Sequence, residues 1–90
     1  MNNVKIAREL VRIARELVGR SLYQPIIKKL LRSLGRDDID PRHVEGFLRL
    51  EFKTLDSLSK SDIKRSMKSI ILAIDSDPKS SEDLAKSYGL

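Results

Sequence analysis

Residues 6–19 read IARELVRIARELVG, so one seven-residue phrase occurs twice in succession with a change only at its last position. At 100° per residue, the apolar members of both phrases gather on about half of the helix circumference, and the charged members occupy a narrower arc opposite. This spacing predicts an amphipathic helix with a broad apolar face and a basic back. We expect it to run from Val4 to Val18, with Asn2 or Asn3 as its N-cap and Gly19 at its end.

A second helix is predicted directly after the first. Ser21-Leu22-Tyr23-Gln24 has the form of a capping box, and Pro25 would then stand in the first turn, where proline is tolerated. We expect this helix to end at Gly35. Its apolar face holds Ile26, Ile27, Leu30, Leu31 and Leu34.

Two start signals predict helices in the middle of the chain. Asp40 followed by Pro41 has the residue types of an N-cap and a first helical position, and this helix should reach about Phe52. Residues 59–62 form a second capping-box pattern. Apolar residues then recur at the spacing of a core-facing helix; they are Ile63, Met67, Ile70, Ile71 and Ile74.

The last predicted helix is short. Asp75-Ser76-Asp77-Pro78 breaks the preceding helix, and Ser80 or Ser81 is expected to cap a final one that ends before Gly89. No segment shows the two-residue alternation of a β-strand. We therefore predict an all-α fold, a compact bundle of about five helices that forms one domain from residue 1 to 90.

Three positions depart from the helical pattern. Gly46 lies inside a predicted helix, where glycine costs about 1 kcal/mol relative to alanine, so another backbone is expected to approach it closely. Glu51 falls on the expected apolar face, so it should pair with an arginine, lie beyond an earlier helix end, or contact a partner. Leu72 is the converse case, because it points into a charged face.

Residue counts exclude several kinds of site. The chain has no cysteine and one histidine, His43, which excludes disulfides and the usual zinc sites. Its glycines form no phosphate-binding loop, and the acidic turn at residues 75–86 lacks the glycine and the final acid of a calcium loop. We expect no enzymatic activity, no cofactor and no small-molecule substrate, no membrane span, and a cytoplasmic location.

The primary functional prediction is a protein–protein interaction module that associates with itself or with another protein. The broad apolar face of the first helix exceeds what a domain of 90 residues can cover. The residues predicted to contact the partner are Leu10, Val11, Leu17 and Leu72.

The alternative prediction is sequence-nonspecific binding of nucleic acid. Residues 1–36 contain nine Lys or Arg and two acids, a net charge of +7, whereas residues 37–90 carry −2. This charge asymmetry indicates an anionic partner, or neutralisation of one half of the protein by the other half within a dimer. The predicted phosphate-binding residues are Lys28, Lys29, Arg32 and Arg36, joined by Arg8, Arg12 and Arg15 if the two basic faces align. For the first helix the sequence favours a solvated face over phosphate binding, because Glu9 and Glu16 can pair with its cations.

The middle and the end of the chain resemble a group of known sequences. Residues 40–51 (DPRHVEGFLRLE), residues 54–59 (TLDSLS) and residues 83–90 (DLAKSYGL) are similar to short helical proteins of uncharacterised function from bacterial and phage genomes. The resemblance covers about half of the chain. It implies a bacterial or viral origin and carries no activity.

Overall fold

The computed structural model describes residues 3–52, 54–55 and 57–90, and within residues 11–22 it describes the backbone only. In this part of the chain there are four helices: α1 (Asn3–Ser33), α2 (Pro41–Glu51), α3 (Lys60–Ser76) and α4 (Pro78–Ser87). The all-α class predicted from the sequence is confirmed. The number of helices is one lower than predicted because the two N-terminal helices are a single one.

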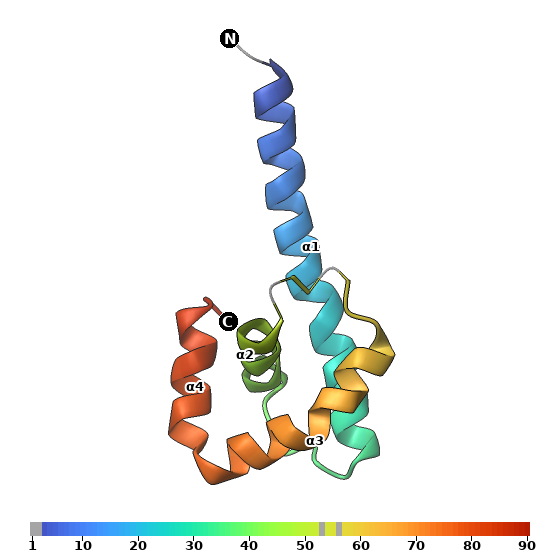
Figure 1. Cartoon of the computed structure of the whole chain (residues 1–90), viewed down its shortest axis with the longest axis vertical. Helices are drawn as coiled ribbons and strands as arrows, with labels where there is room; N and C mark the ends of the chain where they lie inside the picture. Colours follow the sequence, from blue (N-terminus) through green and yellow to red (C-terminus); the bar gives the residue numbers. More distant parts are fainter. Residues whose placement is uncertain (1–2, 53, 56) are drawn as a thin grey trace.

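Helix α1 passes without interruption through Gly19 and Pro25 (Figure 1). The predicted stop at Gly19 and the new start at Ser21 are therefore wrong. Glycine in a helix interior costs only about 1 kcal/mol relative to alanine. It can adopt the left-handed conformation that ends a helix, but nothing forces it to do so. The segment Tyr23–Leu31 packs in the core. This packing favours a helix here over the break that the local cap signals predict.

The C-terminal end of α1 has the predicted glycine cap. Gly35 has a φ of 71°, and the N–H groups of Arg36 and Gly35 donate to the carbonyl oxygens of Leu31 and Arg32 at 2.8 and 3.1 Å. These two bonds are those of a Schellman motif, which satisfies the last carbonyls of a helix. Leu34 belongs to the predicted apolar face, but it is 52% exposed. It follows the last helical residue, where the chain already turns away.

The remaining helix starts follow the sequence signals closely. Asp40 caps α2 by accepting the N–H of Arg42 at 3.0 Å, and Ser59 and Asp62 form a reciprocal capping box at the start of α3. Asp77 ends α3 and also caps α4 through the N–H of Ser80 at 3.1 Å. The final helix thus begins at Pro78, earlier than the predicted caps at Ser80 or Ser81.

The core is built around α2, which packs against α1, α3 and α4. α2 lies between α4 and the lower half of α1, with α3 crossing beneath (Figure 1). The fully buried side chains include Ile27, Leu31, Val44, Leu48, Ile63 and Met67. Every buried core residue belongs to the chain from Tyr23 onward, as far as the described side chains go.

Two close contacts fix how α2 is placed. A Cβ on Gly46 would lie 3.3 Å from both the Cα and the N of Ala85 in α4, so the predicted close backbone approach is confirmed. Glu51 is exposed at the last position of α2, whereas Glu45, in the middle of the same helix, is buried. The helix presents Glu45 inward because α2 is covered on several sides.

Candidate functional site

The N-terminal part of α1 extends beyond the bundle (Figure 1). We call residues 3–22 of α1 the arm. All side chains of residues 3–10 are exposed, and the apolar ones include Val4 at 62%, Ile6 at 46% and Leu10 at 62% exposure. The molecule measures 52 × 25 × 18 Å, and the arm accounts for its elongation. Leu10, one of the predicted partner contacts, is therefore accessible.

The apolar face of the arm and the buried face of α1 coincide only in part. Leu10 and Ile27 are seventeen residues apart on one helix, which places them about 100° from each other around the axis at 3.6 residues per turn. Ile6 and Leu31, in contrast, lie within about 20° of each other on the same basis, so the two faces overlap in part. The apolar side chains described on the arm are exposed because this part of α1 extends beyond the bundle (Figure 1).

Several predicted site residues lie on the arm beyond the described side chains. Val11 and Leu17, predicted to contact a partner, and Arg12 and Arg15, predicted to contact phosphates, fall in this part. Arg8 is described and exposed.

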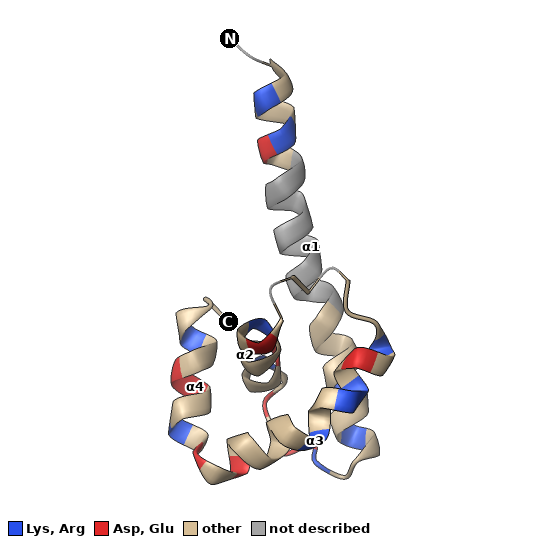
Figure 2. Ribbon diagram, viewed as in Figure 1, with Lys and Arg blue, Asp and Glu red and all other residues tan. Residues whose placement is uncertain are grey.

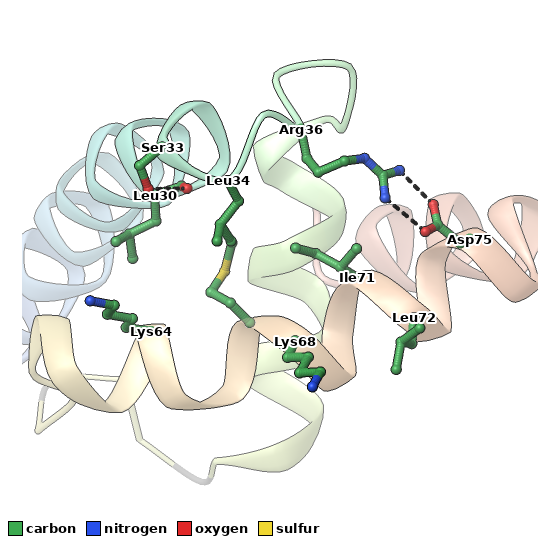
Figure 3. A pocket seen from close by; sticks show the side chains of 10 residues that line it. Leu30, Ser33, Leu34, Arg36, Lys64, Lys68, Ile71, Leu72 and Asp75 are labelled. Atoms are coloured by element: carbon green, nitrogen blue, oxygen red, sulfur yellow. Dashed lines mark hydrogen bonds and ion pairs between the residues drawn. The ribbon is translucent and has the colours of Figure 1, made fainter.

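Leu72 belongs to a second surface, a groove between the end of α1 and α3. The groove has a volume of about 390 Å³, and Leu72 lies on its rim with 59% exposure (Figure 3). Its outward orientation, predicted from the sequence, is confirmed. The structure does not bring Leu72 together with Leu10, because the groove is part of the bundle and Leu10 is on the arm (Figure 1).

The predicted phosphate-binding residues divide into two groups. Lys28, Lys29 and Arg32 are exposed on α1, and no carboxylate in the described part of the chain forms an ion pair with them. Figure 2 marks the basic and acidic positions along the ribbon. Arg36 is engaged instead. Its two terminal nitrogens donate to Asp75 at 2.6 and 2.8 Å, and its Nε donates to Asp38 at 3.1 Å. Both carboxylates compete with any phosphate for this guanidinium.

The Arg36 cluster holds the end of α1 against the end of α3. Hydrogen bonds to Asp75 and then Asp38 raise the pKa of Arg36 above its ordinary value, and the same bonds lower the pKa of both aspartates. The bidentate geometry fits a guanidinium to a carboxylate. This contact gives Arg36 a structural role that the sequence pattern did not indicate, since 39 residues separate it from Asp75.

Two buried polar contacts were also not predicted. Glu45 is fully buried and accepts from Nε of Arg49 at 3.3 Å, one helical turn away. Ser81 is fully buried, donates its hydroxyl to the carbonyl of Pro78 at 2.7 Å and lies 3.4 Å from Nδ1 of His43. The i, i+4 spacing of Glu45 and Arg49 could have indicated their ion pair, although not its burial.

The Ser81–His43 contact is a link between α2 and α4. The Ser81 oxygen is buried and its proton is already donated to a carbonyl, whereas a nucleophile must reach its substrate. Within the described residues, no three His, Asp or Glu side chains group as metal ligands.

None of the helices in the described residues has both the length and the apolar character that crossing a membrane requires.

Comparisons with known proteins give no relative for this chain: no family model, curated protein or solved structure matches it. The resemblance of the middle and final segments to bacterial and phage proteins stays a prediction.

Proposed function

We propose that this protein is a small helical interaction module that associates with itself through the arm. The observation that carries the proposal is the exposure of Val4, Ile6 and Leu10 on a helix that leaves the bundle. Most helical stability in proteins comes from packing of an apolar face rather than from intrinsic helix propensity. A partner surface would supply that packing.

The sequence of the arm suits helix–helix pairing. Ile6, Leu10, Ile13 and Leu17 are separated by steps of four, three and four, the spacing that places apolar residues along a seam between two helices. A second line of apolar residues beside it widens the face beyond that of a two-stranded coiled coil; it consists of Ala7, Val11, Ala14 and Val18. Such a face can contact two neighbours or pack broadly on one.

A pair of matched leucine variants tests this proposal. Leu10 on the arm and Leu50 on α2 are 62% and 63% exposed, so aspartate at either position changes the charge equally and buries no new group. Size-exclusion chromatography with light scattering, at about 1–100 µM protein, should give an oligomer for the wild type. Leu10→Asp should shift the protein to monomer and Leu50→Asp should leave the mass unchanged. A wild-type monomer at every concentration, or equal effects of both variants, would refute self-association through the arm.

We propose, as a second candidate, nonspecific binding of nucleic acid by Lys28, Lys29 and Arg32. The observation in its favour is that all three are exposed and without a carboxylate partner in the described residues. The logarithm of the binding constant for duplex DNA should then fall with the logarithm of salt concentration, by about 0.9 per phosphate contact. Replacing the three residues with alanine should remove most of this slope. Arg36→Ala should not change it, because Asp38 and Asp75 occupy Arg36.

A dissociation constant weaker than about 100 µM for both duplex DNA and RNA at physiological salt would exclude this second candidate.

A further inference from the structure

The groove between α1 and α3 has apolar walls that the fold leaves open. Leu30 comes from the end of α1, Leu34 directly follows this helix, and Met67, Ile71 and Leu72 come from α3 (Figure 3). Met67 and Leu30 form its floor because they are nearly inaccessible, whereas Leu34 and Leu72 are 52% and 59% exposed on its rim. Leu34 and Leu72 therefore add exposed apolar surface to the rim of the groove.

The charge around the groove is positive. Lys64 and Lys68 line it from α3, one helical turn apart, and both are exposed. Lys29 is also exposed and stands one turn before Ser33, a lining residue, on the same side of α1. The carboxylate in the lining is Asp75, and both of its oxygens accept hydrogen bonds from Arg36. A ligand therefore meets lysines whose charge no lining carboxylate offsets.

We propose that this groove binds the apolar face of an acidic amphipathic helix from a partner protein. Such a helix places apolar residues at positions i, i+3 or i+4, and i+7 into an apolar groove. Its flanking Glu or Asp side chains would stand opposite Lys64 and Lys68, and this complementarity selects the partner by charge.

The arm of a second copy does not suit this groove. Residues 3–22 contain five Lys or Arg and two Glu, so the arm has the same sign of charge as the groove rim. Like charges at a rim select against a partner. Binding of an acidic helix in the groove is therefore independent of self-association through the arm.

The experiment uses two synthetic peptides and the full chain. Both peptides are 18-residue helices with leucines at the spacing above; one carries glutamates beside the leucines and the other carries lysines at the same positions. Fluorescence anisotropy should show that the glutamate peptide binds at least about tenfold more tightly, the effect expected of a few rim ion pairs. Leu72→Ala should weaken binding, and Leu50→Ala, at an equally exposed leucine outside the groove, should not.

A charge-reversed variant tests whether Lys64 and Lys68 determine the preference for the glutamate peptide. Lys64→Glu/Lys68→Glu should reverse the preference, so that the lysine peptide becomes the tighter ligand. Lys28→Glu/Lys79→Glu has the same net charge and should keep the original preference, because neither residue lines the groove. Circular dichroism of each variant checks that the bundle is folded. The measurements are repeated with Leu10→Asp, which separates groove binding from association through the arm.

Three results would overturn the proposal. The first is that neither peptide binds below about 1 mM, the weak end of measurable affinity. The second is an equal loss of affinity in both charge-reversed variants, which would show an effect of net charge alone. The third is that dodecanoate, a small anionic amphiphile, binds with the same dependence on Lys64 and Lys68 while the glutamate peptide does not bind.

Discussion

Gly46 shows how a single missing side chain sets the distance between two helices. Its Cα faces the backbone of Ala85, where an added Cβ would stand 3.3 Å from two backbone atoms. Most real Cβ atoms keep a larger distance, and a backbone cannot rotate away as a long side chain can. The interior glycine therefore lowers the intrinsic helix propensity of α2, but it permits the close packing of α2 on α4.

Substitutions at Gly46 should reverse the usual order of helix propensity. On an exposed helical site, Gly→Ala stabilises by up to about 1 kcal/mol. At Gly46 that gain should be lost to displacement of α4, and Gly46→Val, with two further methyl groups, should destabilise the protein by about 1–3 kcal/mol. Urea unfolding followed by circular dichroism measures both changes. A Gly46→Ala variant more stable by the full propensity gain would contradict the close approach.

Which glutamate of α2 is buried could not be predicted from the sequence. The sequence pattern placed Glu51 on the core face, whereas the structure leaves it exposed and buries Glu45. Helical periodicity identifies one apolar stripe, but α2 is covered by three helices and its buried surface is wider than the stripe. Which polar residue enters the core depends on neighbours that are remote in sequence, and on a partner such as Arg49 that can reach it.

The Arg36–Asp75 pair gives the stability of the fold a defined acid dependence. Hydrogen bonds from Arg36 lower the pKa of Asp75 in the folded state. A carboxylate with a lowered pKa contributes stability above its unfolded pKa of about 3.9 and loses that contribution as the pH falls towards the folded value. Asp75→Asn should thus lower the urea midpoint at pH 7 and reduce its further decrease below about pH 4.

Asp83→Asn is the control for that measurement, because Asp83 is exposed on α4 and forms no ion pair with the described residues. It should keep the wild-type dependence on pH. The same acid dependence in Asp75→Asn and wild type would show that the pair contributes nothing to stability.

At the scale of helices, three of the termini that depend on local chemistry were predicted correctly. The caps at Asp40 and Ser59 and the glycine stop at Gly35 each use residues within a few positions of the helix terminus. The continuity of α1 was not predicted, because it depends on a balance between local cost and tertiary contacts. The segment from Tyr23 to Leu31 contributes four core side chains, which favour a helix there whatever precedes it.

The role of Pro25 distinguishes one continuous helix from two. In a continuous α1, proline removes the hydrogen bond to the carbonyl of residue 21 and crowds that carbonyl. Pro25→Ala should then raise helical content and stabilise α1 by up to about 3 kcal/mol. If a helix instead began at Ser21, Pro25 would occupy its first turn and the substitution would change little. Circular dichroism at 222 nm and urea unfolding of the two proteins decide between these arrangements.

On the scale of the whole molecule, the chain combines a bundle that has a buried core with an arm that adds no described side chain to it. All described core residues lie between Tyr23 and Ala85, and the described side chains of the arm contribute none. The all-α class followed from the sequence, because helical spacing recurs in every segment. The separation of the exposed arm from the groove did not, since the groove joins residues near the end of α1 to residues of α3 that are about thirty or more positions away.

Removal of the arm should separate folding from association. A chain that starts at Tyr23 retains every described core residue and places Pro25 within its first helical turn, where the missing N–H has no cost. We expect it to fold cooperatively and to have a melting temperature independent of protein concentration. The full chain should melt at higher temperature as its concentration rises, because association stabilises the folded state by mass action. Differential scanning calorimetry at about 5 and 200 µM measures both behaviours, and concentration dependence that survives the truncation would move the association surface from the arm to the bundle.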